Sequence, residues 1–213
     1  MHTQGRPDGQ PSALELMRSR MAQAEGPIEV NQEELGELVR EMLQFYRRRV
    51  AWMTLAKQAQ SADDLDEADS AYRAAIDDAE HNLAILDFFA RSHVGLDMLE
   101  EQEQHRPFIL MHRALCQAER ALLDQEPDAA IEFLQTGVME IHRCDEAGDP
   151  QEASLDLRPF VHELRAFEKQ IRRRYRRRRT LREQLTDAVP AEDFERAARL
   201  RDALAERTRH RRV

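Results

Sequence analysis

The sequence predicts an all-α protein built as an antiparallel array, or bundle, of helices. Its 213 residues include only 7 Gly and 8 Pro, and 34% of them are charged, a composition typical of helical proteins. Apolar residues recur at intervals of three and four over most of the length, which is the helical period. The breaks between these stretches are short, and short connections make consecutive helices antiparallel neighbours. A chain of this length can bury a substantial core.

The first 29 residues are predicted to form a flexible lead. Gly5-Arg6-Pro7-Asp8-Gly9 has the composition of a turn, because Pro presets φ and Gly tolerates positive φ. Residues 13–23 have the spacing of one short helix, which should end before Gly26-Pro27. We therefore expect the packed part of the chain to begin near residue 30.

Residues 30–170 are predicted to form a helical scaffold domain. Asn31 and Glu34 have the spacing of a capping box, in which each side chain satisfies a backbone N–H of the first helical turn. The helix that they open should run to about residue 60 and be heavily buried. Further helices are expected at 61–93, at 100–123 and from 127 to the break at 148–150. Pro107 either bends the 100–123 helix or marks its true start.

Two stretches of the scaffold are partly similar to the second helix of a tetratricopeptide repeat. They place small, large and small residues at intervals of four and three: Ala68, Tyr72 and Ala75, then Ala130, Leu134 and Gly137. In that repeat the small positions allow close contact between helices. The Trp-Leu-Gly signature of a first helix and the terminal Pro are both missing, so a generic helical bundle stays open as the alternative.

The last long helix is expected to start near Ser154 or Leu157 and to continue through an arginine run toward Leu185, so that residues 171–180 form an Arg-rich helical linker. Seven of the eight residues from 172 to 179 are Arg. Residues 171–213 contain 15 Arg and 7 acidic residues, although the whole chain has a net charge of −9. An acidic body therefore carries a basic tail, which favours either attraction between the two or an acidic partner.

Nucleic acid is one candidate ligand of this run, because guanidinium groups bind phosphates in bidentate geometry. The acidic body and the lack of an aromatic stacking platform beside the run fit equally well with a solvated linker or an acidic protein partner. The residues of the nucleic-acid alternative are Arg172, Arg173, Arg174, Arg176, Arg177, Arg178, Arg179 and Arg182.

Residues 181–209 are predicted to form a hairpin of two short helices joined by a tight turn, with Pro190 at a first helical position. So short a pair buries little apolar surface, and its apolar face should seek another surface. The alternative is an ordinary tail hairpin that packs on its own body. The candidate partner-binding residues share helical faces: Leu181 and Leu185 in the first helix, and Phe194, Ala197, Ala198, Arg201 and Leu204 in the second.

The run Asp193-Phe194-Glu195-x-Ala197-Ala198-x-Leu200-Arg201-Asp202 resembles the UVR motif. This is the helical hairpin of UvrB and UvrC, which also occurs in McsA-type stress adaptors and in some Clp ATPases. The resemblance implies protein–protein docking rather than catalysis, with a second copy, another UVR-containing protein, or a Clp-type or repair complex as partner. The chain has no CxxC, so it departs from McsA-type adaptors, which carry paired CxxC zinc sites.

The body also resembles a group of bacterial proteins, largely planctomycete, that place a helical domain before a UVR motif. The segments that carry this resemblance are GRPDGQ (5–10), AEHNLAILDFFARS (79–92) and QHRPFILMHRALCQAERALL (104–123). Members of the group have further residues before the GRPDG turn, which implies that Met1 is a late start. The resemblance supplies a family but no reaction.

No pattern in the sequence indicates catalysis, a cofactor or a metal site. The chain has no GxxxxGK[ST] loop, no HExxH and no Glu-x-x-His. Asp78 with His81, and His105 with His112, share helix faces, but solvent-facing or capping histidines are the favoured interpretation. Cys116 and Cys144 fall within predicted helices and are expected to be buried thiols. No apolar run approaches the ~20 residues that span a bilayer, and no secretory signal is visible.

The sequence thus predicts a cytoplasmic, non-enzymatic adaptor that docks a protein partner or a second copy through its C-terminal hairpin, in stress response or DNA repair. Two alternatives remain. A nucleic-acid-associated factor would act through the arginine run and would bind with a steep dependence on salt. An enzyme housed in the body would need a polar pocket with convergent ionisable groups.

Overall fold

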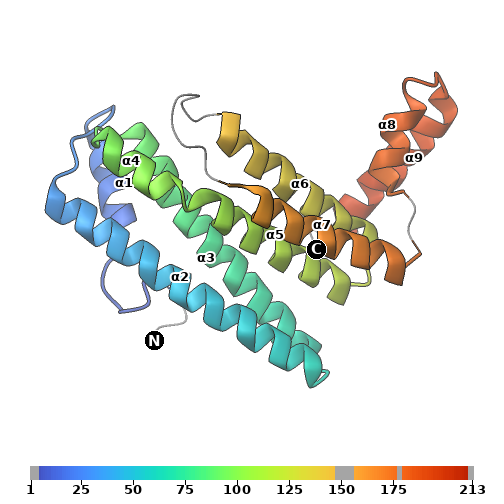
Figure 1. Ribbon diagram of the computed structural model, residues 1–213, viewed down its shortest axis with the longest axis horizontal. Helices are drawn as coiled ribbons and strands as arrows, with labels where there is room; N and C mark the ends of the chain where they lie inside the picture. The colour runs from blue at the N-terminus through green and yellow to red at the C-terminus, as the bar shows by residue number, and fades with distance from the viewer. Residues whose placement is uncertain (1–4, 147–155, 177–178, 211–213) are drawn as a thin grey trace.

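The computed structural model describes residues 5–146, 156–176 and 179–210, and it confirms the all-α class (Figure 1). Within these ranges the one β pairing is an isolated bridge between Glu29 and His93. No helix there is both long enough and apolar enough to cross a membrane. The helices are α1 (Ala13–Gln23), α2 (Gln32–Ser61), α3 (Leu65–Arg91), α4 (Leu96–Glu103), α5 (Arg106–Leu123), α6 (Pro127–Glu146), α7 (Arg158–Arg174), α8 (Leu181–Ala188) and α9 (Phe194–His210).

The long helices form a serial array. α2 packs on α3, α3 on α5, α5 on α6, and α6 on α7. The helices α8 and α9 pack mainly on each other, and Figure 1 shows this hairpin projecting from the array beyond the end of α7. The predicted capping box at Asn31 and Glu34 is present. Pro107 lies in the first turn of α5, separate from the short α4, so it marks a helix start rather than a bend.

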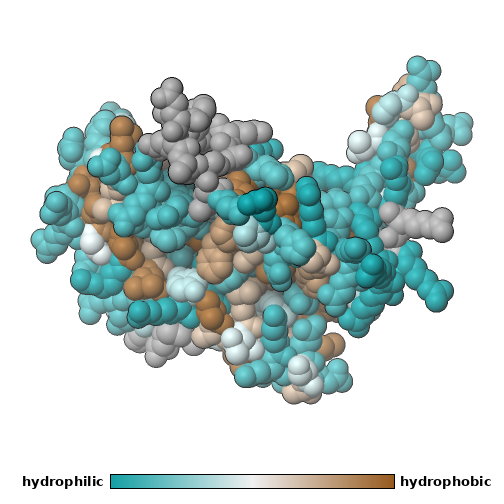
Figure 2. All heavy atoms as spheres, in the orientation of Figure 1, coloured by the Kyte–Doolittle hydropathy of each residue, from teal (hydrophilic) through white to brown (hydrophobic). Residues whose placement is uncertain are grey.

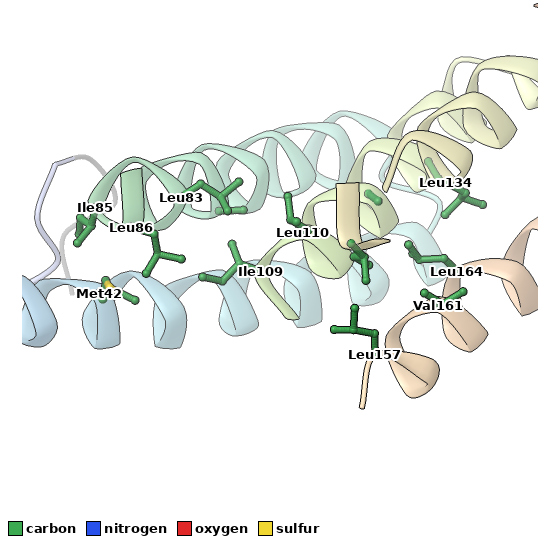
Figure 3. Close-up of a cluster of buried hydrophobic side chains, with 14 of the residues drawn as sticks. Met42, Leu83, Ile85, Leu86, Ile109, Leu110, Leu134, Leu157, Val161 and Leu164 are labelled. Atoms are coloured by element: carbon green, nitrogen blue, oxygen red, sulfur yellow. The ribbon is translucent and has the colours of Figure 1, made fainter. Parts of the chain in front are cut away.

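Most buried apolar side chains form one large cluster that runs through the array, part of which Figure 3 shows, and a smaller cluster lies around Tyr72 and Cys116. Helix α3 contributes to both clusters and packs on both α2 and α5. Leu83 and Leu86 lie in the apolar register that the sequence shows, and both are buried. Ile85 and Phe89 lie on a second line of α3, and both are also buried. Two buried faces explain why α3 carries few exposed apolar side chains.

Gly137 of α6 lies at a close approach between helices, as its small–large–small spacing indicated. A Cβ at this position would lie 2.6 Å from the Cβ of Ala114 on α5 and 3.1 Å from Cδ1 of Leu164 on α7. Ala130 and Leu134, the other members of this small–large–small set, are fully buried. The spacing therefore marks a real close contact, whereas membership in a tetratricopeptide repeat remains a prediction.

The expectation of a flexible N-terminal lead is wrong for residues 5–29. The carboxylate of Glu41 in α2 is fully buried and accepts bonds from the Ser12 hydroxyl (2.8 Å) and from the Ala13 N–H (2.6 Å). Arg6 is buried and pairs with Glu37 at 2.8 Å, and Leu14 is buried in the core. These specific bonds fix the segment on α2, and turn composition alone does not reveal them.

A buried ion pair joins α2 to α3 and was not foreseen. The Arg48 guanidinium donates to both carboxylate oxygens of Asp78, with Nε 2.9 Å from Oδ2 and Nη2 2.5 Å from Oδ1. Its Nη1 also donates to the Gly5 carbonyl at 2.7 Å. Both side chains are almost completely buried. This bidentate geometry compensates the cost of removing two charges from water.

Candidate functional site

The projecting hairpin is built from two well-capped helices. At the start of α8 the Thr180 hydroxyl accepts from the Glu183 N–H at 3.2 Å, and the Glu183 carboxylate accepts from the Thr180 N–H at 2.7 Å, which completes a capping box. Asp193 accepts from the Arg196 N–H at 3.1 Å and so caps α9. Pro190 lies in the turn between the helices, so its predicted place at a first helical position is wrong.

Glu183 also anchors the hairpin to the body. Its Oε1 accepts from Gln135 of α6 at 2.8 Å and from Nη2 of Arg172 at 2.6 Å. Arg172 in turn pairs with Glu168 of α7 at 2.7 Å. Partial burial alone would raise the pKa of Glu183, but the bonds from Arg172 and Gln135 outweigh it and lower this pKa. The link between hairpin and body is therefore strongly polar.

The predicted long helix through the arginine run is wrong. α7 ends at Arg174, and Arg176 has a φ of 51° in the left-handed region, which breaks the helical path. Crowding of like charges disfavours further turns, and the capping box at Thr180 starts a new helix. The sequence contained that signal as Thr180-x-x-Glu183. The linker at 171–180 is thus helical only up to Arg174 among the residues that the structure describes.

The arginines of the run do not act as one group. Arg172 is half-buried in ion pairs, Arg174 stacks on Tyr175 at 5.5 Å, and Arg179 pairs with Asp187. Arg177 and Arg178 lie outside the described residues. The remaining members are exposed: Arg173, Arg176 and Arg182. No single helical face therefore carries the whole set that the sequence suggested.

The predicted docking residues of the hairpin fall into two groups, one between the two helices and one on the outer side of α9. Leu181, Leu185, Ala197 and Leu204 are half-buried, as expected for residues along the seam between α8 and α9. Phe194 is 69% exposed. Helical spacing places the half-buried Ala198 and the exposed Arg201 on the same side of α9 as Phe194. Arg201 donates to its neighbour Asp202 at 2.9 Å.

Val189 was missed by the sequence reasoning and lies at the tip of the hairpin with Phe194. It is 54% exposed and immediately follows α8, whereas Phe194 opens α9 on the other side of the turn. We call Val189 and Phe194 the tip pair. Figure 2 shows apolar surface among hydrophilic residues on this projecting part of the molecule. Val189 follows Leu181 and Leu185 at intervals of four residues, so the helical spacing of α8 was the signal that could have added it to the candidate residues.

Several ionisable groups of the body are buried. Burial raises the pKa of the Cys116 thiol to about 12 and so keeps it protonated at neutral pH. Burial, with the nearby charges of Arg49 and Lys57, lowers the pKa of His112 to about 4. His112 is thus buried and not solvent-facing, contrary to the prediction. The prediction is also wrong for His81, whose Nε2 lies 2.7 Å from Oε1 of the buried Glu41. Among the described residues, no three His, Cys, Asp or Glu side chains converge as metal ligands would.

The fold and site define a helical protein with a capped, projecting C-terminal hairpin that exposes an apolar tip. Residues 176–206, from the end of the helical body through most of α9, match the family model for the UvrB/uvrC motif, UVR. The chain thus carries a UVR motif at its C-terminal end. Residues 1–175 lie outside this match, and the resemblance of the body to a bacterial group remains a prediction. Neither the curated proteins nor the solved structures include a match to the chain.

Proposed function

We propose that the protein is a non-enzymatic adaptor of the cytoplasm, in which the helical body holds the UVR hairpin away from its own surface for a protein partner. The observation that carries this proposal is the tip pair, Val189 and Phe194, exposed at the end of a projecting hairpin. The partner is a second UVR hairpin, on another copy or another protein, or a Clp-type or repair complex. The motif match supports this class of partner.

The position of the tip pair distinguishes it from the other exposed apolar residues. Leu96, Leu16 and Met139 are also exposed, but they lie on separate helices of the body, and single apolar residues on a surface are normal. The tip pair brings two large apolar side chains to either side of one turn. An exposed aromatic residue surrounded by polar residues is typical of the centre of a docking surface.

The charges around the tip fit a role in partner choice. Three acidic residues are close to Phe194 in the sequence: Glu192 and Asp193 precede it and Glu195 follows it. Two basic residues, Arg196 and Arg201, come later on α9. All five side chains are exposed. In docking of this kind, apolar burial supplies most of the affinity, whereas rim charges act on association rate and on the selection of partners.

A site-specific photo-crosslinker tests the proposal. The photoreactive residue replaces Phe194 in one protein and Leu96 of α4 in a matched control, because Leu96 is 73% exposed but lies on the body. After irradiation in the lysate of the native organism, we expect a discrete protein adduct from position 194 and none of that mass from position 96. Equal adduct patterns from the two positions, or no adduct from position 194, would overturn the docking proposal.

A further inference from the structure

The exposed side of α7 carries a straight row of cations that the docking proposal does not use. Arg165, Lys169 and Arg173 follow one another at intervals of four residues, and Arg158 precedes them on the same side of the helix. All four side chains are exposed, while Val161, Leu164 and Ile171 bury the opposite side in the core. We call Arg158, Arg165, Lys169 and Arg173 the α7 stripe.

In the part of the chain that the structure describes, three of the four cations of the stripe lack a carboxylate partner, although the chain as a whole is acidic. The protein has 41 acidic and 32 basic residues, and many body arginines are paired, including Arg106, Arg113 and Arg120. Within the described ranges, neither Arg165, Lys169 nor Arg173 contacts a carboxylate, although Arg158 pairs with Asp156. Unpaired cations in a row, in a chain with carboxylates in excess, indicate a surface kept available for an external anion.

The length and spacing of the row fit a regular polyanion. Arg158 and Arg173 are 15 residues apart in one helix, a distance of about 22 Å at 1.5 Å per residue. One strand of duplex nucleic acid presents a phosphate about every 3.4 Å along its axis, so the stripe spans roughly six phosphates. Lys and Arg side chains are long enough to adjust to that spacing, and Arg binds phosphate in bidentate geometry.

The surroundings of the stripe favour duplex backbone over other anions. No large apolar side chain of α7 is exposed, whereas helices that bind membrane surfaces bury apolar residues in the lipid. Phe160 and Phe167 pack against the core, so no aromatic platform for single-stranded bases accompanies the row. We propose that the α7 stripe binds the phosphate backbone of duplex nucleic acid without reading its sequence, independently of the tip pair.

Fluorescence anisotropy with a labelled DNA duplex of roughly 20 base pairs, well beyond the reach of the stripe, tests this proposal. The stripe variant is Arg165→Gln, Lys169→Gln and Arg173→Gln together. The matched control is Arg18→Gln, Arg40→Gln and Arg47→Gln, which removes the same charge from exposed positions of α1 and α2. For the wild type, we expect affinity to fall steeply with salt. The stripe variant should lower the log–log salt slope by about 3 and weaken binding at least tenfold at low salt.

The control variant and a Phe194→Glu variant should both bind the duplex as the wild type does. Absence of duplex binding, or equal losses in the stripe and control variants, would refute the proposal. Two parallel assays address the other anions: flotation with phosphatidylserine vesicles, and sedimentation to detect pairing of the stripe with the acidic body of a second copy. The proposal is wrong if the stripe variant weakens vesicle binding or self-association but leaves duplex binding intact. Circular dichroism of each variant verifies that α7 is folded.

Discussion

Substitution of Gly137 by Ala tests a close contact of α6 with α5 and α7. The added Cβ would lie 2.6 Å from Cβ of Ala114, which has no rotamer to move, and 3.1 Å from Cδ1 of the buried Leu164. Overpacking costs about 1–3 kcal/mol, and a distance of 2.6 Å to a side chain that cannot rotate away places this substitution at about 2–3 kcal/mol, of which the higher helix propensity of Ala offsets about 1 kcal/mol. We therefore expect Gly137→Ala to lower the free energy of unfolding by about 1–2 kcal/mol, measured by urea denaturation followed at 222 nm.

Gly36 provides the matched control because it is also helical but open. It lies exposed in α2, and a Cβ there would meet no atom within 4 Å. Only the higher helix propensity of Ala acts at this position, so Gly36→Ala should raise the free energy of unfolding by about 0.5–1 kcal/mol. Opposite signs for the two substitutions would support the packing described here. A neutral or stabilising effect of Gly137→Ala would show that α5 and α6 do not approach so closely.

Three further predictions follow from the polar contacts. Asp78→Ala leaves the buried Arg48 guanidinium without its carboxylate and should cost about 3–5 kcal/mol in urea denaturation. Burial lowers the pKa of His112 to about 4, so between pH 6.5 and 4 this histidine takes up a proton in the unfolded chain but not in the folded protein, and the free energy of unfolding falls as pH falls. His112→Asn should remove a pH dependence on the order of 3 kcal/mol from that window, measured by urea denaturation at several pH values. Glu183→Ala removes the capping box and the anchor to α6 and α7, so amide exchange in residues 181–188 should accelerate about tenfold while core amides do not change.

Much of the array could be predicted from the sequence because its helices are strongly periodic. The line of Ala68, Tyr72, Ala75 and Ala79 in α3 specifies one buried face, and the residues on it are buried. The pairing of Arg48 with Asp78 could not be predicted in the same way. Arginine in mid-helix normally faces solvent, and only the packing of α2 on α3 brings its carboxylate partner within reach. A polar residue such as Asp78 on a buried line was the available hint.

The hairpin was predictable for a different reason, since its signals are local in the sequence. The Phe-Glu, paired Ala and Leu-Arg-Asp elements lie within ten residues, from Asp193 to Asp202, and the match to the UVR model covers them. The end of α7 was misplaced because residues 160–189 contain no Gly or Pro that would indicate a break, while the stop depends on a left-handed residue at Arg176 and on the cap at Thr180. The exposure of Val189 depends on tertiary structure and has no local signature.

The most direct test of the docking account is affinity purification of the protein from its native organism, with nuclease treatment and quantitative mass spectrometry. Phe194→Glu places a charge on the tip pair, and Leu96→Glu places the same charge on an equally exposed position of the body. Because both positions are exposed, neither variant should lose thermal stability. The account predicts that specific protein partners are lost with Phe194→Glu and retained with Leu96→Glu. The same set of partners with wild type and Phe194→Glu would contradict it.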